Sequence, residues 1–308
     1  TPVEHLPRLS AALGGPTLLV KRDDQTGLAF GGNKTRKLEY LLAEAQANGA
    51  RTLITGGAAQ SNHCRQTAAA AARFGFRCIL VLAGEPPERA SANLLLDDLF
   101  GAQIVWCTPD ARDETMQQVF EQAWEAGERP FLIPYGGSSP TGAAAYAFAM
   151  QELLSQDVRP DWIVVASSSG GTQAGLAAGA HLFGFEGRVL GISIDKPEVE
   201  LSAGIVAGLA SQVCERLGQP HTFQPQDILV DDRFLGGGYG VMGEAEREAI
   251  RLFARHEGLL LDPVYTGRAA AALIARIRNG EFQRGEQVLF WHTGGTPALF
   301  ADRYAPHL

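Results

Sequence analysis

The sequence predicts an α/β fold in which a mostly parallel β-sheet is covered by helices on both faces. Short apolar segments that do not alternate with polar residues are typical of strands buried on both faces of a parallel sheet. Alanine-rich segments of helical character separate these strands, which favours the α/β class. Over positions 51 to 134 the strands follow one another about every 25–30 residues, as successive βα units do.

The elements alternate along the chain. We expect strands at Thr17–Val20, Arg51–Ile54, Cys78–Val81, Gln103–Trp106, Phe131–Ile133, Trp162–Val165, Val189–Ile192 and Val288–Phe290. We expect helices at 34–49, 61–74, 111–127, 139–155, 171–184 and 243–256. The glycine-rich segment Leu235–Gly240 is predicted to be a loop, because glycine clusters interrupt regular structure.

Length and composition exclude several classes of protein. The chain has 308 residues, 45% hydrophobic and 19% charged, which suits a globular protein of about two domains. Its formal net charge of -8 argues against nucleic-acid binding, which needs clustered Lys and Arg. No stretch of about 18 apolar residues predicts a membrane span, and no basic segment followed by an apolar one predicts a signal peptide.

The four cysteines carry no metal-site signature. They form no C-x-x-C pair and have no histidine at ligand spacing, so we expect no zinc site. Without a disulfide framework, a reducing cytoplasm is the expected compartment.

A lysine lies at the glycine-rich entrance of a predicted helix. Gly27 and Gly32 have P-loop spacing, but Asn33 intervenes before Lys34, so the motif that holds nucleotide phosphates is not matched. We expect Asn33 to cap the helix. Desolvation and nearby cations would lower the pKa of Lys34 and suit it to reaction with a carbonyl group. An isolated lysine would more often lie on a solvated face.

Two further loops follow predicted strands and lead into helices. The segment 60–65 reads Gln-Ser-Asn-His-Cys-Arg. Ser61 or Asn62 would serve as an N-cap, but six functional side chains exceed what a cap needs. The segment Ser167–Gly171 is a Ser/Gly loop, and backbone N–H groups at the following helix N-terminus favour a phosphate monoester.

Two more motifs lie near the C-terminal end. Tyr265 and Thr266 follow Asp262-Pro-Val, and His292 and Thr293 follow the last apolar segment. Taken singly, these residues are compatible with packing at a strand end and with a buried core histidine. Taken with the lysine and the phosphate loop, they suit pyridoxal 5'-phosphate, whose aldehyde reacts with an amine.

The chain resembles, over nearly its whole length, the pyridoxal-phosphate enzymes of the tryptophan-synthase-β fold, and more narrowly the 1-aminocyclopropane-1-carboxylate deaminase / D-cysteine desulfhydrase family. The resemblance rests on the motifs Lys21–Asp24, Gly31–Tyr40, Gln60–Arg65, Gly170–Gly175, Asp262–Tyr265 and His292–Gly295. It implies fold type II, with two open, twisted and mostly parallel sheets flanked by helices. It also implies a larger domain of residues 1–39 and 151–308, a smaller domain of residues 40–150, and a homodimer.

The resemblance assigns roles to individual residues. Lys34 would carry the cofactor, Lys37 would hold its phosphate, and Asn62 would contact the ring hydroxyl. Ser61, Tyr265 and Tyr239 would be catalytic, and the remaining cofactor contacts would come from Ser169, Gly170, Gly171, Thr172, Thr266 and Thr293. The substrate, a small amino acid, would be bound by Ser61, Asn62, His63, Tyr239 and Tyr265.

Thr266 and Thr293 distinguish two branches of that family. Members that open the cyclopropane ring typically carry Glu and Leu at these positions, so the chain resembles the D-cysteine desulfhydrase branch. A hydroxyl in place of a carboxylate leaves the pyridine nitrogen closer to neutral, which suits β-elimination of a good leaving group. The alternatives are an L-cysteate sulfo-lyase, a 1-aminocyclopropane-1-carboxylate deaminase and a non-catalytic metabolite-binding protein.

Overall fold

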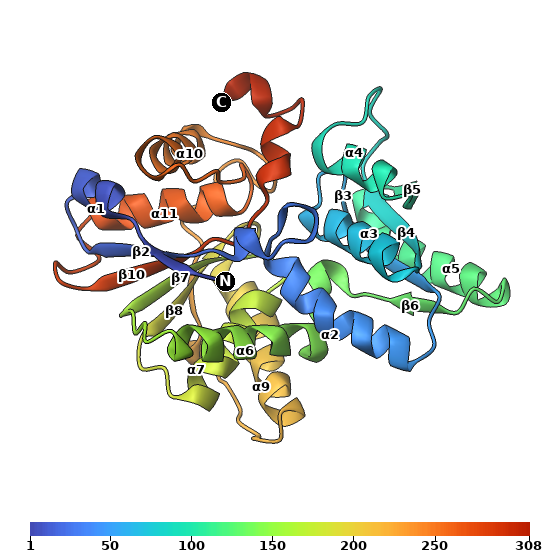
Figure 1. Cartoon of the computed structure of the whole chain (residues 1–308), viewed down its shortest axis with the longest axis horizontal. Helices are drawn as coiled ribbons and strands as arrows, with labels where there is room; N and C mark the ends of the chain where they lie inside the picture. Colours follow the sequence, from blue (N-terminus) through green and yellow to red (C-terminus); the bar gives the residue numbers. More distant parts are fainter.

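The computed structural model describes residues 1–308 and arranges them as two lobes, each built on one β-sheet (Figure 1). The strands are β1 (Val3–His5), β2 (Thr17–Lys21), β3 (Thr52–Ala58), β4 (Arg77–Ala83), β5 (Gln103–Cys107), β6 (Pro130–Leu132), β7 (Trp162–Ser167), β8 (Arg188–Ser193), β9 (Leu229–Asp231) and β10 (Gln287–Trp291). All eight predicted strands are present. The sequence did not predict β1 and β9, which have only three residues each.

The larger sheet has six strands in the order β1-β2-β10-β7-β8-β9. Only the edge strand β1 is antiparallel to its neighbour, and the other pairs are parallel. The smaller sheet has four strands in the order β5-β4-β3-β6, all parallel. The two mostly parallel sheets confirm the fold expected from the resemblance.

The helices are α1 (Pro7–Leu13), α2 (Asn33–Ala47), α3 (Asn62–Phe74), α4 (Ala92–Leu99), α5 (Arg112–Glu125), α6 (Pro140–Ser155), α7 (Gly171–Phe183), α8 (Glu198–Leu201), α9 (Ala207–Arg216), α10 (Glu244–Glu257) and α11 (Thr266–Arg278). Six of them coincide with predicted helices. Residues 235–240 form turns without a helix or strand, which confirms the predicted loop. No helix is long and apolar enough to cross a membrane.

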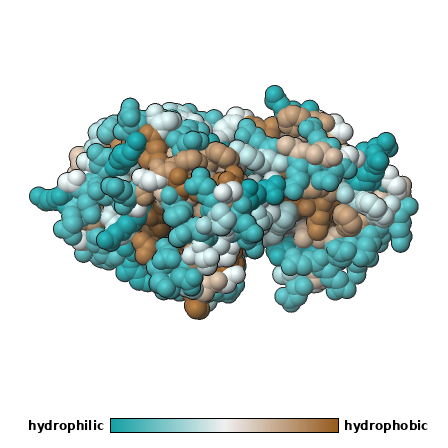
Figure 2. All heavy atoms as spheres, turned by 90° about the horizontal axis from the view of Figure 1, so that it is seen from below, coloured by the Kyte–Doolittle hydropathy of each residue, from teal (hydrophilic) through white to brown (hydrophobic).

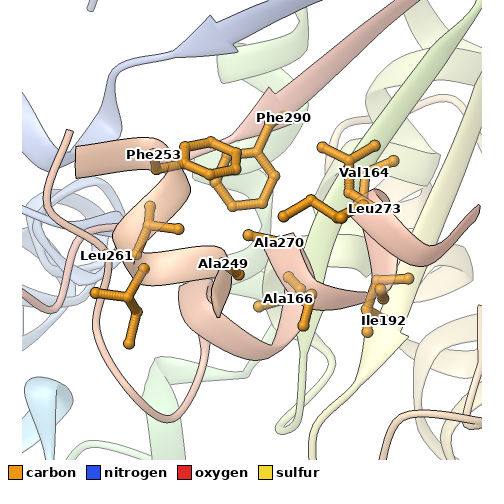
Figure 3. Packing of buried hydrophobic residues seen from close by; sticks show 14 of the residues in the cluster. Val164, Ala166, Ile192, Ala249, Phe253, Leu261, Ala270, Leu273 and Phe290 are labelled. Carbon is orange, nitrogen blue, oxygen red and sulfur yellow. The ribbon is translucent and has the colours of Figure 1, made fainter. Parts of the chain in front are cut away.

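The main core lies between the larger sheet and the pair α10 and α11. Phe253 of α10 stacks at a tilt on Phe290 of β10, with ring centroids 5.3 Å apart. Leu273 of α11 and Val164 of β7 belong to the same buried cluster (Figure 3). On the opposite face, α6, α7 and α9 form a second cluster rich in alanine, and small side chains allow helices to pack closely.

The smaller sheet has its own core. Leu38 and Leu41 of α2 pack with Leu80 of β4 and with residues of α3. Met116 and Val119 of α5 cover Ile54 and Val81. Figure 2 shows a notch between the two lobes. Because α2 runs across residue 39 and α6 across residue 150, the exact domain boundaries stay a prediction.

Candidate functional site

The N-termini of α2, α3, α7 and α11 converge on one pocket between the two lobes. Its lining comes from segments far apart in the sequence: Asn33, Lys34, Ser61, Asn62, His63, Tyr135, Gly136, Ala166, Ser167, Ser168, Ser169, Gly170, Thr172, Tyr265 and Thr293. Since helix N-termini present unpaired N–H groups and positive potential, this arrangement favours an anionic ligand.

Lys34 reaches the pocket from the first turn of α2. Gly31 and Gly32 precede it with φ of 64° and 126°, a left-handed region that favours glycine. The helix begins at Asn33, whose side-chain amide donates to Thr172 Oγ1 at 3.0 Å. The expectation that Asn33 caps α2 was therefore wrong, because the amide is used to join α2 to α7.

Two lysines share one backbone acceptor. Lys34 Nζ and Lys37 Nζ each donate to the carbonyl oxygen of Gly136 at 3.1 Å. Burial lowers the pKa of Lys34 from 10.5 to about 8. Burial and the neighbouring charge of Lys34 place the pKa of Lys37 well below its ordinary value. The pocket therefore shifts both amines towards the neutral form, which is the direction that the sequence suggested for Lys34.

The loop before α7 forms a cradle for an anion. A Cβ atom at Gly171 would lie 2.5 Å from Ser138 Oγ and 2.9 Å from Lys37 Nζ, and one at Gly136 would lie 2.3 Å from Ser169 Oγ. The hydroxyls of Ser167 and Ser168 are buried and have no hydrogen-bond partner. Buried hydroxyls without partners mark an incomplete donor set, and with the α7 N-terminus they fit a phosphate group.

The N-terminus of α3 supplies three neighbouring polar side chains. Ser61 is the N-cap, and its Oγ accepts from the backbone N–H of Cys64 at 3.1 Å. Ser61 also lines the pocket, so capping and pocket contact are combined in one residue. His63 Nε2 bonds to Thr55 Oγ1 at 2.9 Å, while its Nδ1 has no partner. Burial and then the nearby lysine charges keep the pKa of His63 well below its usual value, so the ring is neutral.

Two phenols meet at one side of the pocket. Tyr265 precedes α11 and its hydroxyl bonds to that of Tyr239. Tyr239 lies on the adjoining cleft between the lobes, rather than among the residues of the pocket itself. Burial raises the pKa of both phenols well above the ordinary value, so both hydroxyls stay protonated and able to donate.

The two threonines that separate the family branches lie in different places. Thr293 lines the pocket. Thr266 does not: it begins α11, and its hydroxyl donates to Asp262 Oδ1 at 2.7 Å and accepts from the N–H of Asp262 at 2.7 Å. The interpretation of Tyr265 and Thr266 as strand-end residues was wrong, because they start a helix. His292 is fully buried outside the pocket, as the core interpretation expected.

The predicted residues Lys37 and Gly171 lie directly behind the pocket rather than on its surface. Gly171 N–H donates to Ser138 Oγ at 3.2 Å, and Ser138 Oγ also bonds to Ser169 Oγ at 2.8 Å. These contacts join the loop after β6 to the loop after β7, so both lysines and both loops form one connected site.

The sequence analysis missed Tyr135 and Gly136. It recognised the Ser/Gly loop that contains Ser167 and Ser168 but gave these two hydroxyls no individual role. Tyr135 lines the pocket, and the guanidinium of Arg112 lies 4.3 Å from its ring centroid. A signal was available, because Tyr-Gly-Gly-Ser-Ser follows a predicted strand after a single proline, and the recognised Ser/Gly loop also follows a strand. The shared position at a strand's carboxyl end was the feature to use.

Comparison with known proteins gives consistent results. The family model described as pyridoxal-phosphate dependent enzyme matches residues 1–294. The D-cysteine desulfhydrases of Salmonella typhi and Salmonella newport (strain SL254) are each 44% identical, over 100% of this chain and 94% of their own. A crystal structure described as an ACC deaminase homologue is 39% identical, with a TM-score of 0.87, covering 97% of this chain and 90% of that one.

A more distant structure, threonine deaminase isoform 2 from Solanum lycopersicum, is 15% identical with a TM-score of 0.69, covering 96% of this chain and 79% of its own. At that identity it supports the fold only, which is fold type II. With the family match over almost the whole length and relatives at 44% identity, the chain belongs to the pyridoxal-phosphate dependent enzyme family.

Proposed function

We propose that this protein is a lyase that uses pyridoxal phosphate to eliminate sulfide from D-cysteine. The products are hydrogen sulfide and an enamine, which water converts to pyruvate and ammonia. Full-length similarity to D-cysteine desulfhydrases supports the substrate. The observation that carries the chemistry is the amine of Lys34, which is largely desolvated and lies in the same pocket as an anion cradle.

The residues present fit the cofactor. The hydroxyls of Ser167 and Ser168, which lack partners, and the α7 N-terminus would hold its phosphate. Lys37 lies behind this cradle and adds positive charge when protonated. Lys34 would carry the aldehyde carbon, and Asn62 and Thr293 would contact the ring. When bound, pyridoxal phosphate supplies an electron sink for the electron pair left at the substrate Cα.

The chain's own groups would move the protons. Lys34 Nζ, once the substrate amine has displaced it from the aldehyde carbon, would accept the Cα proton, since a free amine with a pKa of about 8 is matched to proton transfer near neutral pH. Tyr265 is protonated and hydrogen-bonded to Tyr239, so it can donate a proton to the departing sulfur. Ser61 and His63 lie beside them in the pocket and would bind the substrate.

We also propose that the protein works as a homodimer in the cytoplasm. The four cysteines Cys64, Cys78, Cys107 and Cys214 are all unpaired, which suits a reducing compartment. The dimer rests on the family resemblance, and light scattering of the purified protein tests it. A monomeric mass at micromolar concentration would contradict it.

Ring opening of 1-aminocyclopropane-1-carboxylate is the second candidate activity, because a structure described as an ACC deaminase homologue is 39% identical. Thr293 counts against it, since the pocket has a hydroxyl where ring-opening relatives of the family carry Leu. A direct comparison of substrates separates the two activities.

The test measures the release of ammonia, sulfide and the 2-oxo acid product by the protein loaded with pyridoxal phosphate, because ammonia is common to all the candidate reactions and sulfide is specific to cysteine. D-cysteine, L-cysteine, L-cysteate and 1-aminocyclopropane-1-carboxylate are supplied in parallel. We expect turnover of the D-isomer, and we expect Lys34→Ala to abolish both turnover and the visible absorption band of the bound cofactor. Faster turnover of another of these compounds would show that it, rather than D-cysteine, is the substrate. The proposed role of the cofactor would then stand.

A further inference from the structure

Asn62 is held by two neighbours that the proposed activity leaves unexplained. Its Oδ1 accepts from Asn93 Nδ2 at 3.0 Å and from Arg65 Nη1 at 3.2 Å. Asn93 belongs to α4, about 30 residues further along the chain, and both Asn93 and Arg65 are completely buried. Resting on the proposed function, we infer that Asn93 is a positioning residue: with Arg65 it fixes the Asn62 amide so that its N–H groups face the cofactor.

The two donors decide which way the Asn62 amide points. A flipped amide would place its own N–H₂ group against the N–H groups of Arg65 and Asn93, and no acceptor would remain. In the observed orientation Asn62 Nδ2 has no partner within the chain. It lies in space that Gly295 leaves free, since a Cβ there would come within 2.8 Å of Asn62 Nδ2. The remaining donors are thus available to a ligand atom that accepts, such as the ionised ring oxygen of pyridoxal phosphate.

Both polar atoms of the Asn93 side chain are hydrogen-bonded. Its side-chain amide also donates to the carbonyl oxygen of Gln60 at 2.9 Å, and its Oδ1 accepts from Arg65 Nη1 at 2.9 Å. Its backbone N–H donates to Gln60 Oε1 at 3.0 Å. Because the side-chain nitrogen and oxygen of Asn93 are both hydrogen-bonded, its side chain cannot rotate without losing several bonds at once.

The residue before Asn93 has an unusual backbone conformation. Ala92 has a φ of 51°, a left-handed conformation that non-glycine residues rarely adopt and that clusters at functional sites. The Gln60 side chain closes the connection by donating to the carbonyl oxygen of Ser91 at 3.0 Å. The start of α4 is therefore fastened to the start of α3, next to the pocket.

Arg65 extends the connection to the lysine. Its Nη2 donates to the carbonyl oxygen of Gly31 at 3.0 Å, three residues before Lys34. The guanidinium thus contacts the Asn62 side chain and, at the same time, the loop that leads into the helix of Lys34. Through this path Asn93 sets the position of a pocket residue without touching the pocket.

The experiment compares Asn93→Ala, Asn62→Ala and the double variant, using the dissociation constant of pyridoxal phosphate and the pH midpoint of its visible band. We expect Asn93→Ala to weaken binding about tenfold, as the loss of an oriented hydrogen bond does, and to shift the midpoint as Asn62→Ala does. On the Asn62→Ala background, the second substitution should change neither quantity by more than about twofold. Equal effects of Asn93→Ala on both backgrounds would overturn the inference, because the residue would then act independently of Asn62.

Asn93→Asp keeps the test informative if the alanine variant does not fold. A carboxylate still accepts from Arg65 but cannot donate to Asn62 Oδ1, so we expect the same spectral shift. Asp98→Ala, at an exposed position of the same helix, is the matched control and should leave the band unchanged. The affinity for inorganic phosphate is a second control and should stay within about twofold in every variant. An Asn93→Asp protein with the wild-type midpoint would refute the inference, whereas a wild-type protein without any visible band would refute the proposed function itself.

Discussion

The depressed pKa of Lys34 makes the capture of pyridoxal phosphate by the cofactor-free protein dependent on pH in a defined way. Burial lowers this pKa from 10.5 to about 8. At pH 7 the amine is then about 9% neutral, against about 0.03% for an ordinary lysine, a ratio of about 300. Because only the neutral amine attacks an aldehyde, the capture rate should rise about tenfold per pH unit below pH 8 and level off above it.

The assay follows the growth of the visible band after mixing cofactor-free protein with pyridoxal phosphate between pH 6 and 10. A lysine-containing peptide, run at the same pH values, corrects for titration of the cofactor itself. A protein rate that keeps rising tenfold per unit through pH 9 and 10 would refute the reasoning.

The lowered pKa of Lys34 also affects folding stability. Since the folded state binds fewer protons than the unfolded state between about pH 8 and 10.5, the contribution of this lysine to folding stability improves as pH rises through that interval.

Three substitutions test other parts of the site. Gly171→Ala places a Cβ 2.5 Å from Ser138 Oγ. Overpacking that costs about 1–3 kcal/mol should lower the affinity for pyridoxal phosphate about 5- to 150-fold in a binding titration. Tyr265→Phe should leave that affinity within about threefold but lower the rate of sulfide release by about 10²- to 10⁴-fold, if its hydroxyl donates the proton; an unchanged rate would remove Tyr265 from that role. Asp23→Ala removes the buried partner of Arg36, Tyr146 and Trp291, and urea unfolding should show a loss of about 3–5 kcal/mol. Asp113→Ala, at an exposed ion pair, is the control and should have little effect.

Much of the fold was predictable because parallel strands have a strong sequence signature. The burial of β3 is almost continuous along its length, so its apolar segment stood out. The edge strands β1 and β9 lack that signature, since each has three residues and only partial burial. Helix α11 was missed for a different reason: its first residues follow Asp262-Pro-Val, which suggested a strand end. In the structure Asp262 accepts from the N–H of Tyr265 and Thr266 and so starts a helix.

The site residues were predictable only where they lie together in one continuous sequence motif. Lys34, Ser61, Asn62 and Ser169 each lie in a segment with several polar or glycine neighbours, and all four line the pocket. Asn93 has no such neighbours: it is followed by three leucines. Its relation to Asn62 arises from the packing of α4 on α3, which local sequence patterns do not encode.

The helix N-termini and the shared carbonyl of the pocket determine which charge it favours in a ligand. Four helix N-termini point at one volume, and their positive potential disfavours a further cation there. Lys34 and Lys37 share a single acceptor, the carbonyl oxygen of Gly136. One neutral acceptor does not compensate two ammonium groups for the loss of their hydration. The site therefore favours an anion beside an amine whose pKa is lowered, which is the pairing that a phosphate and an aldehyde on one molecule require. Because the amine comes from α2, the shared carbonyl from the loop after β6 and the anion cradle from the loop after β7, that preference exists only when the two lobes are assembled.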